Sequence, residues 1–259
     1  MRKNGYYGED KHYVSVTKVL KVLAKEGIEN WKIDIATKGA VHNVLLELNQ
    51  VLRNSPELVK GFIHRTDLLT SSGDQGRLAL QKEFESATGL GTELHNTIQS
   101  LFNGSNPTPN KIIERAFNSV KDFIEKMGIK PEGVEKTIQS EDGWAGTLDL
   151  LQNVDAKMIR KMMTYVYGKT EIQEGLTVCD WKTTKNVKQF YDESAWQISA
   201  YAKKVGATQG LIINVNKLTG EIKVKPVDVV KGYEKFDSIF NAWKMCKAPQ
   251  WWKKEWGLM

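Results

Sequence analysis

The sequence predicts a mixed α/β fold, in which a central β-sheet is flanked by helices and preceded by a helical N-terminal elaboration. Apolar residues recur at helical spacing through most of the first half of the chain, up to about Met127. After Gly128 the pattern changes to short runs of apolar and β-branched residues, which is typical of strands. Because no clear linker rich in Pro or Gly separates the halves, we expect one domain over residues 1–259.

The first half is expected to contain several helices. Ser15 is a suitable N-cap for a helix that runs through Lys25 and ends at Gly27. Pro56 suits the first turn of a short helix. Three longer helical patterns cover Trp31–Leu52, Gly91–Phe102 and Lys111–Met127. Two segments rich in Ser, Gly, Asn and Pro are predicted to be loops, namely Leu69–Gly76 and Asn103–Asn110.

The second half is expected to supply the sheet. Strands over Val134–Gln139 and Trp144–Leu151 form a hairpin around the turn Ser140–Gly143. A third strand, Leu176–Thr183, is followed by a helix over Phe190–Val205. A second hairpin and a final helix then complete the order β-β-β-α-β-β-α, and they cover Gly210–Asn216, Glu221–Lys225 and Val227–Lys247.

Composition excludes several classes of protein. Hydrophobic residues make up 41% and charged residues 26% of the chain, which excludes wholesale disorder. The cysteines, Cys179 and Cys246, lie too far apart for a metal-ligand motif, so a disulfide framework, a structural zinc site and an iron–sulfur cluster are excluded. The low cysteine count favours a reducing compartment. With no apolar run that could span a membrane and no secretory signal, we expect the cytoplasm, and a removed mitochondrial transit peptide stays open.

The charge balance is modestly positive. The chain has 37 Lys and Arg against 31 Asp and Glu, a formal net charge of +6. Such an excess is compatible with a polyanionic partner such as DNA, although many basic proteins bind no nucleic acid.

Two acidic residues and a lysine fall at the ends of neighbouring expected strands. Asp180 and Lys182 are two positions apart, so both side chains point to one face of their strand, and Asp149 ends the strand before it. If these strands pair, the two Asp side chains and the carbonyl of Trp181 would hold Mg²⁺, which prefers oxygen ligands. Lys182 would then orient a water or stabilise charge on a phosphate. The alternative for the same residues is a solvated, salt-bridged strand edge.

Five motifs together resemble the PD-(D/E)XK nuclease superfamily, in its RecB-like exonuclease branch. The three core motifs are GWAGTLDLL from Gly143, TVCDWKTTK from Thr177 and QISAYA from Gln197. They are similar to the G-T-x-D, D-x-K-T and Q-x-x-x-Y motifs of that branch. GTELHNTIQ, from Gly91, is similar to its histidine-bearing helix.

The fifth motif is YVSVTKVL, from Tyr13, together with Trp31-Lys32, and it is similar to the N-terminal signature of the family except that Val14 replaces the usual proline. The motifs occur in the family's order and span Tyr13 to Tyr201, most of the chain. The nearest resemblance is to the mitochondrial, phage and bacterial exonucleases of the branch.

The resemblance implies a fold and a site. The fold is a restriction-endonuclease-like core over residues 88–247, with residues 1–85 as the helical elaboration and residues 153–175 as an insertion. The insertion makes the separation of Asp149 and Asp180 wider than is usual in the family. The implied Mg²⁺ or Mn²⁺ ligands and catalytic residues are Asp149, Asp180, His95, Trp181, Lys182 and Glu135. Gln197 and Tyr201 are implied to support the site and contact DNA.

Several of these residues also have a purely structural interpretation. His95 lies beside the apolar stripe of its helix, where a histidine is often only a satisfied core-edge residue. Gln197 and Tyr201 are four positions apart on a helix, so they could simply pair with each other. For Glu135, the hairpin turn puts the residue nearly opposite Asp149, which makes a supporting or ligand role sterically reasonable.

Two segments that combine basic and aromatic residues are candidate DNA contacts. The insertion carries Lys157, Arg160 and Lys161 among methionines and tyrosines, so it could grip a strand through phosphate contacts and stacking, or be an ordinary surface segment. The tail carries three tryptophans, Trp251, Trp252 and Trp256. We expect the tryptophans to dock on the body of the protein, and stacking on single-stranded DNA is the alternative.

The resemblance therefore implies a metal-dependent DNA exonuclease that hydrolyses phosphodiester bonds from DNA ends, in replication, recombination or repair. It implies no small-molecule cofactor and no membrane partner. Two alternatives stay open: a structure-specific endonuclease on the same core, and a catalytically inactive DNA-binding module. The complete set of Asp149, Asp180 and Lys182 argues against a decayed site.

Overall fold

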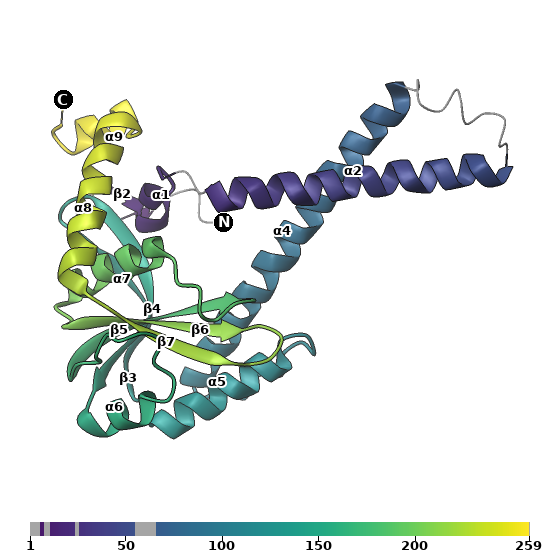
Figure 1. Cartoon of the computed structure of the whole chain (residues 1–259). Helices are drawn as coiled ribbons and strands as arrows, with labels where there is room; N and C mark the ends of the chain where they lie inside the picture. Colours follow the sequence, from purple (N-terminus) through teal and green to yellow (C-terminus); the bar gives the residue numbers. More distant parts are fainter. Residues whose placement is uncertain (1–5, 8–10, 24–25, 55–65, 259) are drawn as a thin grey trace. The chain divides into compact units, whose positions relative to one another are not determined.

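The computed structural model describes residues 6–7, 11–23, 26–54 and 66–258 (Figure 1). Contacts divide the chain into two compact units, one made of residues 1–23 with 91–259 and the other of residues 24–90. The described residues 6–7 and 11–23 therefore belong with the sheet, whereas the sequence-based ranges group them with the rest of residues 1–85.

The smaller unit contains α2, Glu26–Asn54, and the first part of α4, Thr66–Phe102. The expectation of a loop at Leu69–Gly76 is wrong, because these residues lie inside α4. Gly76 is buried, and a Cβ on it would lie 2.5 Å from the carbonyl oxygen of Ala36 in α2. The glycine that suggested a loop instead lets two helices approach closely. Pro56 lies outside the described residues.

The first helix, α1, is shorter than expected. It spans Val16–Leu20, and the Ser15 side chain accepts a hydrogen bond from the Lys18 amide at 3.2 Å, which confirms the N-cap. Hydrogen bonds from Val22 to Val19 and from Leu23 to Leu20 close the helix with tighter, three-residue turns. The expected continuation of this helix is therefore wrong over residues 21–23, Lys25 lies outside the described residues, and Gly27 lies inside α2.

The sheet is mixed, as the sequence predicts. Its strands are β1 (Tyr6–Tyr7), β2 (His12–Ser15), β3 (Pro131–Gln139), β4 (Trp144–Val154), β5 (Gly175–Thr184), β6 (Gln209–Asn216) and β7 (Ile222–Val227). The order is β1-β2-β4-β5-β6-β7, and β3 pairs with β4. The β2–β4 and β5–β6 pairs are parallel and the other pairs are antiparallel, so both expected hairpins are confirmed.

Helices cover both faces of this sheet (Figure 1). Those of the larger unit after α4 are α5 (Glu114–Met127), α6 (Ala156–Met162), α7 (Asp192–Val205), α8 (Val229–Cys246) and α9 (Gln250–Glu255). In Figure 1, α7 and α8 lie on one side of the sheet, and α5 and α6 lie on the other. Helix α7 connects the parallel strands β5 and β6, which need such a crossover. The architecture is the helix-flanked mixed sheet of a restriction-endonuclease-like core.

The tail docks on the body, as expected. Trp252 of α9 is buried, and its ring meets Trp243 of α8 edge-on at 5.2 Å between centroids. Trp256 stacks on Trp252 at 5.6 Å and donates its indole N–H to the carbonyl of His12 at 3.1 Å. Trp251, in contrast, is 56% exposed. Two of the three tail tryptophans are therefore structural.

Candidate metal centre

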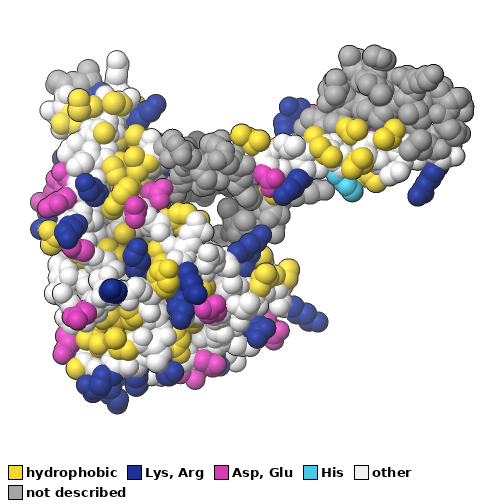
Figure 2. Space-filling view, viewed as in Figure 1, with side chains coloured by type: hydrophobic (Ala, Val, Ile, Leu, Met, Phe, Trp, Pro, Cys, Tyr) yellow, Lys and Arg dark blue, Asp and Glu magenta, His cyan; other side chains and the backbone are white. Residues whose placement is uncertain are grey.

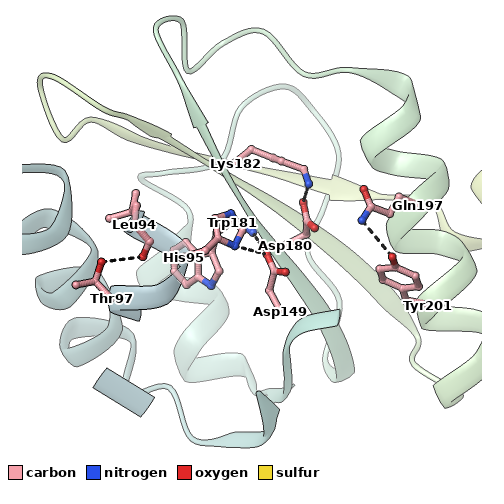
Figure 3. A network of polar contacts seen from close by, with 9 residues as sticks. All are labelled: Leu94, His95, Thr97, Asp149, Asp180, Trp181, Lys182, Gln197 and Tyr201. Carbon is pink, nitrogen blue, oxygen red and sulfur yellow. Dashed lines mark hydrogen bonds and ion pairs between the residues drawn. The ribbon is translucent and has the colours of Figure 1, made fainter. Parts of the chain in front are cut away.

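The candidate site lies where β4 and β5 separate. Their antiparallel pairing runs from Val154–Gly175 to Leu150–Cys179, so Asp149 and Asp180 are the next residues across from each other. The Trp181 amide donates a hydrogen bond to Asp149 Oδ2 at 2.9 Å in place of a ladder bond (Figure 3). Because the pairing of β4 and β5 ends here, the two strands separate and leave space for both carboxylates. Continued cross-strand pairing would hold the two like charges directly opposite each other.

Strand alternation gives β5 two different faces. Lys182 Nζ lies 2.7 Å from Asp180 Oδ2, which shows that the two side chains share a face, as expected from their spacing (Figure 3). Trp181, between them, is buried and meets Phe123 of α5 edge-on at 6.1 Å. The Trp181 side chain anchors β5 on the α5 side, while its neighbours present charge on the opposite side.

His95 reaches the site from the last turns of α4. Its Nδ1 lies 3.4 Å from Asp149 Oδ2 (Figure 3). One helical turn earlier, a Cβ on Gly91 would lie only 2.9 Å from Thr183 Oγ1 of β5. The absence of a side chain at Gly91 therefore lets α4 lie close to β5, which brings His95 to the carboxylates.

Glu135 completes a cluster of three candidate ligands. The β3–β4 register pairs Val134 with Leu150 and Lys136 with Leu148, so Glu135 lies opposite Asp149, as expected. One ligand atom each from His95, Glu135 and Asp149 lies within 4.8 Å of the others. Glu135 has φ +48°, a left-handed conformation that is uncommon for a residue with a side chain. Such local strain is often found where a fold holds a functional group in place.

The electrostatics of the site favour a cation. Burial, and then the neighbouring Asp180, raise the pKa of Asp149 well above its usual range. Burial by itself would lower the pKa of Lys182. The charges of Asp180 and Asp149 outweigh burial, so the pKa of Lys182 is raised. Lys182 is therefore held as an ammonium. Burial lowers the pKa of His95, so its imidazole is kept neutral and able to ligate a metal.

The helix motif plays a supporting part in this structure. Gln197 Nε2 donates to the Tyr201 hydroxyl at 3.2 Å, and Tyr201 is buried (Figure 3). The ring of Tyr201 lies against Gly146, where a Cβ would overlap it. Tyr201 thus packs on the strand that carries Asp149, and the glycine of the GTLD motif makes room for the ring.

The basic residues of the insertion lie on and around α6. Lys161 donates from Nζ to the carbonyl of Lys126 at 2.6 Å, near the C-terminus of α5, where a cation is favourable. Lys157 and Arg160 are exposed. After α6 the chain adds to the edge of the sheet, because Tyr167 donates its amide to the carbonyl of Val224 at 2.8 Å. Lys161 therefore has a structural role, and the insertion is partly built into the sheet.

Two positioning residues were not recognised from the sequence pattern. The roles of Gly91 and Gly146 depend on close approaches between elements distant in the chain, Thr183 for one and Tyr201 for the other. The available signal was the occurrence of a glycine inside an expected helix or strand, within four residues of a candidate ligand.

Comparison with known proteins leaves the family undetermined. No family model matches the chain, and no curated protein matches it. A solved structure titled "Crystal structure of SSO0001" aligns over 74% of this chain and 78% of that chain, with 13% sequence identity and a TM-score of 0.32. None of the helices in the described part of the chain has the length and apolar character that crossing a bilayer requires.

Proposed function

We propose that the chain is a metal-dependent deoxyribonuclease of the PD-(D/E)XK type, an exonuclease that hydrolyses phosphodiester bonds from DNA ends. The observation that carries this proposal is the fork between β4 and β5, where the cluster of His95, Glu135 and Asp149 lies beside the ion pair of Asp180 and Lys182. Three of the motifs that resemble the nuclease family supply most of these residues: His95 comes from GTELHNTIQ, Asp149 from GWAGTLDLL, and Asp180 and Lys182 from TVCDWKTTK.

The donor set suits Mg²⁺ or Mn²⁺. Carboxylate oxygens are the ligands that both ions prefer, and the imidazole nitrogen of His95 suits Mn²⁺ better than the harder Mg²⁺. His95, Glu135 and Asp149 would hold the ion. Asp180, the next residue across from Asp149, is not one of these three clustered ligands, and its Oδ2 pairs with Lys182 at 2.7 Å. A bound ion would lower the pKa of a coordinated water and offset the charge of the attacked phosphate.

The surrounding residues prepare the site for that chemistry. The Trp181 amide holds one oxygen of Asp149 in place, which leaves the other oxygen to a ligand. Lys182 is 34% exposed at its side chain, so its ammonium can reach a bound phosphate while Asp180 orients it. Because the ammonium is kept protonated, Lys182 acts through charge and hydrogen bonding rather than as a base.

The proposal is tested with end-labelled DNA. Single- and double-stranded substrates should be shortened from their ends in Mg²⁺ or Mn²⁺ and stay intact in EDTA. Closed circular DNA should resist cleavage; cutting of circles would indicate the endonuclease alternative. Binding without cleavage of any substrate would indicate the inactive DNA-binding module.

Two substitutions test the assignment of the residues. Asp180→Asn and Lys182→Ala should each lower cleavage by about 100- to 1000-fold, the usual loss when one preorganised charge is removed from such a site. DNA binding in EDTA should change little. Full cleavage by either variant would contradict the assignment. Glu234→Gln, an exposed site on α8, is the matched control and should keep wild-type activity.

The proposal includes a reducing compartment, either the bacterial or phage-infected cytoplasm or the mitochondrion. It rests on the low cysteine count of the sequence.

A further inference from the structure

A second region of unassigned surface combines cations with aromatic rings. A pocket of about 290 Å³ lies between α7, β7 and α8, with Trp196, Lys225, Lys231 and Lys235 in its lining. One carboxylate, Asp228, also lines the pocket, and it pairs with Lys231 at 3.4 Å. The lining therefore holds three lysines against one acid, so the pocket favours an anion.

Lys225, which lines the pocket, also lies beside an aromatic stack. Tyr167 and Phe190 stack with 5.6 Å between ring centroids and 22° between planes. Lys225 Nζ lies 5.5 Å from the centre of the Phe190 ring. Tyr167 is 41% exposed and Tyr191 is 56% exposed. In Figure 2, Lys and Arg side chains lie among hydrophobic ones over the area of β7, α7 and α8, with some Asp and Glu side chains between them.

The sheet register relates this pocket to the metal centre. Asp180 of β5 pairs with Ile212 of β6, and Ile212 pairs with Lys225 of β7. Paired residues of neighbouring strands point to the same face, and each strand spacing is about 4.8 Å, so Lys225 is about 10 Å across the sheet from Asp180. Ile212 between them is buried, so a nucleic acid strand that reaches both places passes over the covering side chains and not along the sheet itself.

We propose that this pocket, named here the lysine–tryptophan pocket, binds a nucleotide of single-stranded DNA away from the bond at the metal centre. Its lysines would contact phosphate oxygens, and Trp196 or the stack of Tyr167 and Phe190 would receive unpaired bases. The inference rests on the proposed function, because it concerns how the substrate of that reaction is held. Exposed rings favour a single strand over a duplex, whose bases are already stacked.

Binding is tested without cleavage. The full chain is titrated into a fluorescently labelled dT₁₂ oligonucleotide in EDTA, and affinity is measured by anisotropy at several salt concentrations. Trp196→Ala should weaken binding by about 5- to 100-fold, the range expected for loss of one stacking platform. Lys235→Gln should make the slope of log affinity against log salt shallower by about 0.7, the loss of one phosphate contact to a single strand.

Matched variants show whether these effects are local. Met245→Ala removes an exposed apolar side chain of α8 outside the pocket, and Lys130→Gln removes an exposed lysine outside the pocket. Neither should change affinity or slope. Because Trp196 also packs against the core, the melting temperatures of Trp196→Ala and the wild type are compared. Lys235 is exposed, so the effect of Lys235→Gln on DNA binding is not complicated by a change in folding.

The outcomes separate this inference from the proposed function. Unchanged dT₁₂ binding in both Trp196→Ala and Lys235→Gln would overturn the pocket assignment even if the chain cleaves DNA. Equal losses in the Met245 control, or competition by polyglutamate as strong as by unlabelled dT₁₂, would also overturn it. Selective losses in a chain that cleaves no DNA would support the pocket and reject the nuclease.

Discussion

At the scale of single residues, Asp149 is a carboxyl whose ionised form is disfavoured by its surroundings. Burial and the nearby Asp180 both disfavour its ionised form, so the pKa of Asp149 is raised. The protein accepts this cost at a position where two carboxylates could share a divalent cation. Such a compromise between stability and activity is common at functional sites.

Asp149→Asn should therefore stabilise the metal-free protein at neutral pH. A carboxyl whose folded pKa is raised contributes stability below its ordinary pKa, near 3.8, and that contribution is lost as the pH rises through the raised value. The variant carries no such charge, so its melting temperature in EDTA should exceed that of the wild type at pH 8. The difference should shrink as the pH is lowered toward 5. Asn keeps the acceptor for the Trp181 amide, which leaves the local hydrogen bond in place.

Calorimetry in EDTA across that pH range checks this prediction. A melting temperature of Asp149→Asn below that of the wild type at pH 8 would contradict it. Saturating Mn²⁺ serves as the internal control, because a cation bound to the wild-type carboxylate should reverse the order of the two proteins.

At the scale of elements, the local geometry of strand β4 depends on its pairing with β2 and β5 and on its contact with α7. It pairs with β2 at Trp144 and Ala145 and with β5 from Leu150 onward. Between these ladders, Gly146 receives the ring of Tyr201 from α7, and Asp149 opens toward the site. Helix α7 therefore supports the position of Asp149, because its Tyr201 ring packs on Gly146 of the same strand.

Gly146→Ala should disturb this support. Its Cβ would overlap the Tyr201 ring, so we expect a loss of about 1–3 kcal/mol of stability, typical of an overpacked contact. In a chain of this size each kcal/mol lowers the melting temperature by about 2–4 °C. Cleavage should fall as well, because Asp149 lies three residues away on the same strand. The double variant Gly146→Ala, Tyr201→Leu should recover part of the lost stability.

A helical glycine in open space supplies the control for that substitution. No atom lies within 4 Å of a Cβ built on Gly89 of α4, so Gly89→Ala should stabilise the helix, by roughly 0.5–1 kcal/mol. Melting curves of the variants compare the two sites directly. An equal response of Gly146→Ala and Gly89→Ala would show that Tyr201 does not restrict Gly146.

The elements also show what a single sequence can predict. Both hairpins, β5 and α7 follow from short-range patterns of apolar residues and turns, and the structure confirms them. Leu69–Gly76 was predicted wrongly because Gly76 serves a contact with Ala36 of α2, and no local pattern records such a contact. The approach of Gly91 to Thr183 was missed for the same reason.

At the scale of the whole molecule, the candidate site draws on elements far apart in the chain. His95 comes from α4, Glu135 from β3, Asp149 from β4 and the charged pair from β5. The spacing of Asp180 and Lys182 predicts that they share a face, since strand geometry alone dictates it. That His95 meets Asp149 was implied only by resemblance, because helix-to-sheet packing cannot be worked out from local periodicity.

A ligand held by so many elements should stabilise the whole fold. Because metal would bind the folded chain and not the unfolded one, Mn²⁺ at 100 times its dissociation constant should add about 2.7 kcal/mol. At about 2–4 °C per kcal/mol, the melting temperature should rise by about 5–10 °C. His95→Ala and Asp149→Asn should each strongly reduce this rise in melting temperature. Glu234→Gln, at an exposed position of α8, should leave the rise unchanged. Calorimetry with Mn²⁺, Mg²⁺ and EDTA measures the effect, and an equal shift in all four proteins would place the metal elsewhere in the chain.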